Sequence, residues 1–193
     1  RYLRKWQQSE LLHLPQPRVL LMGLCGSLTP RYSVGNIVLC QTCVYKSDAS
    51  PQLLRIDSNP ELTAQLSQDL QGKADFVQVL TSDRLIWSAQ EKHYLGQKYG
   101  AEAVDMEGYA ALDVLGQAGI AVAMFRVVSD DSKHDLPNLS SALSPDGVLQ
   151  SLPLAIGMLR QPLAATRLIR GALQGLQVLQ KVTTHLFRVR EGD

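Results

Sequence analysis

The sequence has 193 residues, of which 45% are hydrophobic and 19% are charged, and its net charge is +1. This composition fits one globular domain with a sizeable core, and it excludes a strongly charged disordered chain and a nucleic-acid binder with a marked basic excess. Three cysteines cannot complete a disulfide set, and no apolar run reaches the roughly 18 to 20 residues that span a bilayer, so we expect a cytoplasmic protein.

Apolar runs alternate with helix-type periodicity along the first two thirds of the chain. The pattern predicts helices over residues 1–12, 60–71, 88–99 and 106–117, buried strands over 18–22, 34–44, 76–80, 103–104 and 120–128, and a tight turn over 23–27. Asn59 is expected to cap the helix that starts at Pro60. Strands that are apolar throughout and separated by helices indicate an α/β fold whose sheet is covered on both faces.

The last part of the chain differs in charge and pattern. Residues 1–150 carry 13 basic and 16 acidic side chains, whereas residues 151–193 carry 6 basic and 2 acidic ones. We therefore expect an α/β domain over 1–150 and a helical extension of that domain over 151–193. After Pro162, apolar side chains recur at helical spacing and predict an amphipathic helix. This helix packs on the domain or on a partner subunit, or else contacts a membrane surface or an apolar substrate.

Two short motifs carry little information by themselves. Gly23-x-x-Gly26 could let backbone N–H groups approach an anion, but it lacks the lysine of a P-loop, and ordinary turn glycines explain it equally well. Cys40-x-x-Cys43 resembles half of a zinc site whose other half is missing, so buried thiols are the better interpretation. The sequence shows no zinc-protease or serine-hydrolase motif. We therefore expect no metal and no organic cofactor.

Carboxylates gather where predicted strands end. Glu107 opens a helix directly after the short strand at 103–104, and Asp130 and Asp131 follow the apolar strand at 120–128. Ligands bind at the carboxyl ends of strands in α/β sheets, where an acid can transfer a proton or hold a sugar hydroxyl. Glu107 could equally stabilise a helix dipole, and the two aspartates could cap a loop. The spacing leaves both interpretations open.

Four segments resemble the nucleoside phosphorylase and nucleosidase superfamily, in the right order. Residues 19–28 (VLLMGLCGSL) with 34–38 (VGNIV) are similar to its apolar strand, G-x-x-G turn and V-G-D-x-V pattern. The segments 103–110 (AVDMEGYA) and 125–130 (FRVVSD) are similar to its V-x-M-E-x-x-A and R-x-x-S-D motifs. Residues 81–86 (TSDRLI) resemble the stretch that lines the base pocket. The resemblance implies a three-layer α/β sandwich around a central mixed sheet that lacks the first strands.

The resemblance also implies roles for individual residues. Asp130 would protonate or hydrogen-bond N7 of a departing purine, and Ser129 would orient it. The substrate would be bound by the ribose-binding Glu107, by Met106 under the sugar and by the main chain of Ile86 at the base edge. Gly23 and Gly26 would face the nucleophile or phosphate.

The sequence departs from the family pattern in two places. About fifty residues at the family's amino end, including the glutamate that activates water in nucleosidases, have no counterpart, so the chain would be truncated or degenerate. Phosphate ligands of the hexameric phosphorylases are replaced by Leu21 and Leu24, which favours hydrolysis over phosphorolysis.

The segments 129–137, 144–147 and 159–162, together with the helical tail, are similar to hopanoid-associated phosphorylases. We therefore expect cleavage of an adenine nucleoside with a bulky or apolar 5′ group, adenosylhopane-like. The alternatives are a methylthioadenosine or adenosylhomocysteine nucleosidase, and a nucleoside-binding protein without catalysis. A homo-oligomer, dimeric or hexameric, follows from the family, and no nucleic-acid partner is expected.

Overall fold

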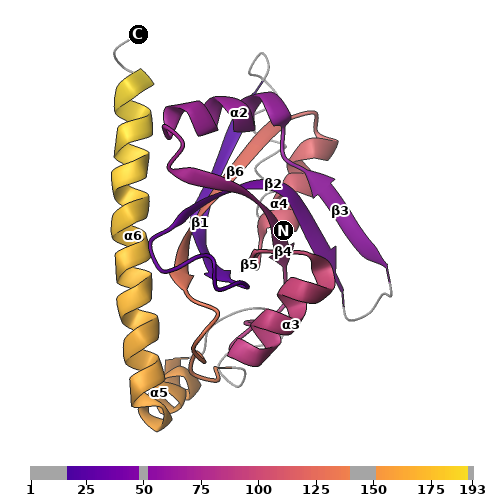
Figure 1. Ribbon diagram of the computed structural model, residues 1–193. Coiled ribbons are helices and arrows are strands. Elements are labelled where there is room, and N and C mark those ends of the chain that lie inside the picture. Colours follow the sequence, from indigo (N-terminus) through magenta and orange to yellow (C-terminus); the bar gives the residue numbers. More distant parts are fainter. Residues whose placement is uncertain (1–16, 48–51, 140–150, 191–193) are drawn as a thin grey trace.

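The computed structural model (Figure 1) describes residues 17–47, 52–139 and 151–190 of the chain. Six strands in these ranges form one sheet in the order β3-β2-β4-β5-β1-β6. The strands are β1 (Arg18–Ser27), β2 (Ile37–Lys46), β3 (Leu53–Asp57), β4 (Ala74–Thr81), β5 (Ala103–Asp105) and β6 (Ala121–Asp130). Neighbours are parallel in β1–β6, β2–β4 and β4–β5 and antiparallel in β1–β5 and β2–β3, so the sheet is mixed.

The sheet also closes on itself. Along one side, β2 pairs antiparallel with β6 over residues 37–39 and then with β3 over residues 42–46. Five strands therefore form a ring, and β3 lies outside it on β2. The predicted three-layer sandwich is not confirmed in detail, because this closure replaces a flat central layer.

The described residues include five helices around the curved sheet. They are α2 (Pro60–Asp69), α3 (Ala89–Tyr99), α4 (Gly108–Gln117), α5 (Ser151–Arg160) and α6 (Pro162–Arg190). The Asn59 side chain accepts a hydrogen bond from the Leu62 N–H at 2.9 Å, which confirms the predicted cap of α2. At the carboxyl end of α3, Gly100 adopts a left-handed conformation (φ 63°), which is unfavourable for residues other than glycine.

The strand β6 separates two hydrophobic clusters, because successive side chains of a strand point to opposite faces. Val122, Met124 and Val128 pack in one cluster with Leu112 and Leu115 of α4. The alternate residues pack in a second cluster with α2 and α6; they are Ala123, Phe125 and Val127. The Arg126 side chain therefore belongs to the α4 face of the sheet. The register shift at Cys25 and Gly26 interrupts the alternation before Asp130, which lines a cavity together with α6.

Helix α6 runs along the outside of the sheet, beside β1 and β6 (Figure 1). Its apolar side contributes Val178, Leu179, Val182 and Leu186 to the second cluster. The helix approaches the main chain of β6 closely at Gly171 and Gly175. A Cβ atom at Gly171 would overlap the Ser129 carbonyl oxygen, and one at Gly175 would lie 2.8 Å from Leu24 Cδ2. Packing on the domain is thus the observed arrangement of the buried face of the predicted amphipathic helix.

Some expectations about local structure need correction or fall outside the described residues. The turn expected over residues 23–27 is wrong, since β1 continues through Ser27 with only a register shift at Cys25 and Gly26. The edge strand β3 was not predicted, because its short sequence LLRID shows neither a long apolar run nor clear alternation. The helix predicted over 1–12 and the motif at 144–147 lie outside the described residues.

Candidate active site

The site is built around two side chains of β6 that cross β1. Arg126 pairs in register with Gly23, and Asp130 pairs with Gly26. A Cβ atom at Gly23 would lie 2.7 Å from Arg126 Nη1, and one at Gly26 would lie 2.7 Å from Asp130 Oδ2. The two glycines of the G-x-x-G motif therefore leave room for an arginine and an aspartate to pass over β1.

The Arg126 side chain reaches Asp105 at the end of β5. Its Nε and Nη2 donate to Asp105 Oδ2 at 3.0 and 2.7 Å, and both side chains are almost fully buried. The other oxygen, Asp105 Oδ1, accepts from the Thr81 hydroxyl at 2.8 Å and from the Gly108 N–H at 3.1 Å. A carboxylate offers about four acceptor positions, so that of Asp105 is saturated by the protein itself.

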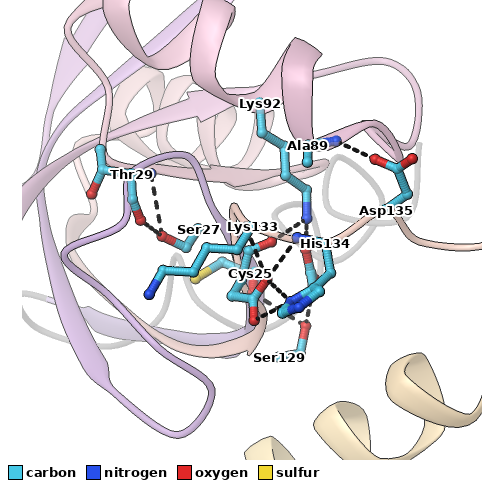
Figure 2. Close-up of polar contacts among 11 residues, drawn as sticks. Cys25, Ser27, Thr29, Ala89, Lys92, Ser129, Lys133, His134 and Asp135 are labelled. Carbon is cyan, nitrogen blue, oxygen red and sulfur yellow. Dashed lines mark hydrogen bonds and ion pairs between the residues drawn. The ribbon is translucent and has the colours of Figure 1, made fainter. Parts of the chain in front are cut away.

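The Asp130 carboxylate is held differently. Its Oδ2 contacts the ammonium of Lys92, which projects from α3, and its Oδ1 accepts from the Ser129 hydroxyl at 3.0 Å. The same hydroxyl also contacts the Cys25 carbonyl at 3.2 Å. Figure 2 shows Lys92 pointing from its helix toward Ser129 and Cys25. With 13% of its side chain exposed and two protein donors, Asp130 retains acceptor capacity for a ligand.

The structure places the remaining predicted residues after β5 and beside Val104. Gly26 is opposite both Asp130 and Val104, so the end of β6 lies near the residues that follow β5. Met106 and Glu107 follow β5 and are exposed, with 39% of Met106 accessible. Glu107 occupies the cap position of α4 but makes no capping hydrogen bond with its side chain. Ile86 is buried and packs with Leu28 and Val104.

Two cavities border the site. One, of about 190 Å³, lies between the end of β6 and α6; it is lined by Ser129, Asp130 and Leu136 and, from α6, by Arg167, Arg170 and Gly171. A smaller one, of about 70 Å³, is lined by Ile86, Thr81 and Ser82 among others. The tail helix thus forms a wall of a cavity that Asp130 also lines.

The cysteines are not arranged for metal binding or nucleophilic attack. Cys25, Cys40 and Cys43 are free and buried. Burial, reinforced by the charge of Asp130, raises the pKa of the Cys25 thiol, and the hydrogen bond to Cys43 together with burial raises the pKa of Cys40. Among the described residues, no group of three or more His, Cys, Asp or Glu side chains could hold a metal ion.

Two residues of the site escaped the sequence-based prediction. Arg126 is part of the R-x-x-S-D motif, but the motif gives no role for its side chain. No motif in the sequence indicates that Lys92 belongs to the site. A lysine in the middle of a helix normally faces solvent, so only its position on the inner face of α3, beside Leu95 and Gly96, could have indicated burial. The sequence does not predict which distant carboxylate such a lysine meets.

Within the described ranges, no helix is long and apolar enough to cross a membrane. No curated protein sequence gives a significant match to the chain. Solved structures share its fold. A methylthioadenosine/adenosylhomocysteine nucleosidase (MTAN) of Helicobacter pylori is 20% identical, with a TM-score of 0.56, over 66% of this chain and 64% of that one.

Other neighbours overlap more extensively. Futalosine hydrolase of Helicobacter pylori is 15% identical, with a TM-score of 0.68, over 97% of this chain and 74% of that one. A nucleosidase of Streptococcus pneumoniae is 15% identical, with a TM-score of 0.62, over 88% and 68%. The chain thus spans about two thirds to three quarters of the length of these proteins.

The family model of the phosphorylase superfamily matches residues 8–144, which is well over half of the chain. This range contains β1 with its two glycines, the segment after β5, and the end of β6 with Asp130. The expected class, a nucleosidase or nucleoside phosphorylase, agrees with this match. The chain belongs to the phosphorylase superfamily of enzymes.

Proposed function

We propose that this protein cleaves the N-glycosidic bond of an adenine nucleoside with a bulky or apolar 5′ substituent, adenosylhopane-like, and releases adenine. The observation that carries the proposal is the Asp130 carboxylate, which is held at the end of β6 by Ser129 and Lys92 and keeps acceptor capacity. The fold neighbours named as nucleosidases and a futalosine hydrolase support the same reaction class.

The chemistry requires an acid at this place. When the C1′–N9 bond breaks, its electron pair stays with the purine while the sugar takes on oxocarbenium character. A proton delivered to N7 neutralises the leaving base, and such positioned proton transfer contributes typically about 10²- to 10⁴-fold. Asp130 is ionised in the free protein, so it must take up a proton when the substrate binds before it can deliver one to N7. Ser129 fixes its orientation through the 3.0 Å hydrogen bond.

Other groups bind the substrate in this proposal. Glu107 has an exposed carboxylate without a capping bond and is available to two ribose hydroxyls. Met106 packs against the sugar, and the main chain of Ile86 contacts the base edge. Gly23 and Gly26 line the side of the nucleophile. Because Leu21 and Leu24 stand where phosphate ligands would be, we favour water over phosphate as the nucleophile.

The apolar 5′ substituent is proposed from the resemblance of the helical tail to hopanoid-associated phosphorylases. Helix α6 forms part of the cavity at Asp130 through Arg167, Arg170, Gly171 and Gln174. Its exposed apolar side chains, among them Ile169, Leu173 and Leu176, lie outside that lining. A smaller 5′ group defines the alternative, a methylthioadenosine or adenosylhomocysteine nucleosidase, which is favoured by the names of the fold neighbours.

Three further expectations stay predictions. They are a homo-oligomer of two or six copies, a cytoplasmic location, and a weak contact of the tail with a membrane surface. Helix α6 has exposed apolar side chains, and residues 162–190 include five basic and no acidic residues. Such a surface suits contact with a partner subunit or with a membrane surface.

The test is release of adenine, followed by chromatography, from adenosine, methylthioadenosine and adenosine derivatives with 5′-alkyl chains of increasing length. Asp130→Asn should slow release at least about 100-fold, because an amide has no acidic proton to give. Asp113→Asn on α4 is the control for a charge change away from the site. Unchanged turnover in the Asp130 variant would refute the proposal. Nucleoside binding without adenine release by the unmodified protein would identify a non-catalytic relative.

A further inference from the structure

Lys92 occupies an unusual place for a lysine. Its side chain is fully buried on α3, and its ammonium contacts Asp130 and donates to the Asp131 carbonyl at 2.8 Å. A buried ammonium is strongly unfavourable unless it is paired and hydrogen-bonded. A methionine of similar length would fill the same space without that penalty. Packing alone therefore does not explain a lysine here.

The contact depends on features of separate elements. Lys92 comes from α3, Asp130 from the end of β6, and Gly26 from β1, which pairs with β6. Gly26 is needed because a Cβ atom there would lie 2.7 Å from the carboxylate oxygen that faces Lys92. Ser129 donates to the other oxygen of Asp130, so both carboxylate oxygens have a protein partner.

We propose that Lys92 is a positioning residue for the reaction, acting through Asp130. This inference rests on the proposed function. Asp130 first takes up a proton from solvent when the nucleoside binds. As C1′–N9 breaks, the electron pair of that bond passes to the purine and the proton moves from Asp130 to N7. The carboxylate that remains is stabilised by the Lys92 ammonium, a charge already in place before the reaction starts. Lys92 thus sets both the orientation of the acid and the stability of its conjugate base.

The test uses two adenosine analogues that differ at position 7 of the base. In 9-deazaadenosine N7 carries a hydrogen that can donate to the Asp130 carboxylate, and its C-glycosidic bond is not cleaved. In 7-deazaadenosine a C–H group replaces N7 and cannot take part. Calorimetric titration of both nucleosides measures how well Asp130 is presented, independently of turnover.

We expect the unmodified protein to prefer 9-deazaadenosine. Lys92→Met should weaken binding of this analogue at least about tenfold, because a charge-assisted hydrogen bond loses its oriented acceptor, and should change 7-deazaadenosine binding less than about twofold. Lys92→Arg, which keeps the charge, should retain a large part of the preference. Lys98→Met, at an exposed lysine of the same helix, is the matched control.

The outcomes separate the two proposals. A Lys92→Met protein that keeps the full preference, or loses affinity equally for both analogues, overturns the role of Lys92 while leaving the proposed function standing. Unmodified protein that binds neither analogue overturns the proposed function and the role of Lys92 with it. If Lys92→Met does not fold, as judged by circular dichroism, Gly26→Ala replaces it, because the added methyl group separates Asp130 from Lys92 with both residues still present.

Discussion

Two ion pairs cross the strand β1, three residues apart, and they differ in what they leave unused. Asp105 receives two hydrogen bonds from Arg126, one from Thr81 and one from a backbone N–H, and its side chain is 1% exposed. Among the described residues, the donors to Asp130 are Lys92 and Ser129, and 13% of the Asp130 side chain is exposed. The first pair is complete and ties strands together, whereas the second has acceptor positions free for a ligand. Spare hydrogen-bonding capacity, more than charge, therefore separates a candidate catalytic carboxylate from a structural one.

The largest effect is expected from breaking the complete pair. Arg126→Met removes the cation and leaves the Asp105 carboxylate buried with only Thr81 and Gly108 as donors, so the free energy of unfolding should fall by about 3 to 5 kcal/mol. Urea denaturation followed by circular dichroism measures this. Arg31→Met is the control, because its partner Asp75 is 49% exposed and such surface pairs contribute about 0 to 1 kcal/mol. Equal losses in both variants would mean that the two environments do not differ as described.

A medium effect is expected where α6 approaches the strand end that carries Asp130. Gly171→Ala places a methyl group against the Ser129 carbonyl oxygen, which forces α6 away from β6 and should cost about 1 to 3 kcal/mol. Gly116→Ala on α4 is the matched control, since its nearest neighbour would be Ile56 Cδ1 at 4.0 Å and alanine has the higher helix propensity. Thermal unfolding of both proteins measures the difference. A neutral Gly171 variant would show that the close packing of α6 is dispensable.

The smallest effect is expected at the neighbouring aspartate. Burial tends to raise the pKa of Asp131, but hydrogen bonds from the His134 ring and from the N–H groups of Lys133 and His134 outweigh it, so the pKa lies below the usual 3.8. The unfolded chain then binds the proton more readily, and ionised Asp131 stabilises the fold above pH 3.8. Asp131→Asn should therefore cost less than about 1 kcal/mol at pH 7, with 28% of its side chain exposed.

The dependence on pH supplies the check on Asp131. The difference in unfolding free energy between Asp131→Asn and the unmodified protein should shrink as the pH falls through the lowered pKa of Asp131. A difference that is constant between pH 7 and pH 3, or as large as that of Asp130→Asn, which leaves Lys92 unpaired, would contradict this account.

Much of the fold could be predicted from the chain because its signals are local. Apolar runs located β4 and β6, and the caps at Asn59 and Gly100 placed two helix ends. The continuation of β1 through the G-x-x-G motif could not be predicted. Glycines usually indicate a turn, and here they make room for side chains that are about a hundred residues away in the sequence.

The residues of the candidate site, too, were predictable only where a local sequence signal marks them. Asp130 and Ser129 stand out because they end a strongly apolar strand and form part of a recognisable motif. Lys92 has no such signal, because its partner is 38 residues away and is brought to it by the whole sheet. Long-range pairing of charges is a property of the tertiary structure, which periodicity and propensity do not encode.

Closure of the five-stranded ring affects how the protein folds. The Ser129 hydroxyl meets the Cys25 carbonyl across 104 residues of chain, and β6 contacts both β1 and β2. Contacts of such sequence separation slow folding, since loop entropy is lost before they are made. Until β6 docks, one edge of β1 and one of β2 stay open, and open edges invite association with other chains. We therefore expect newly synthesised protein to need dilute conditions or a chaperone to prevent association until β6 has docked.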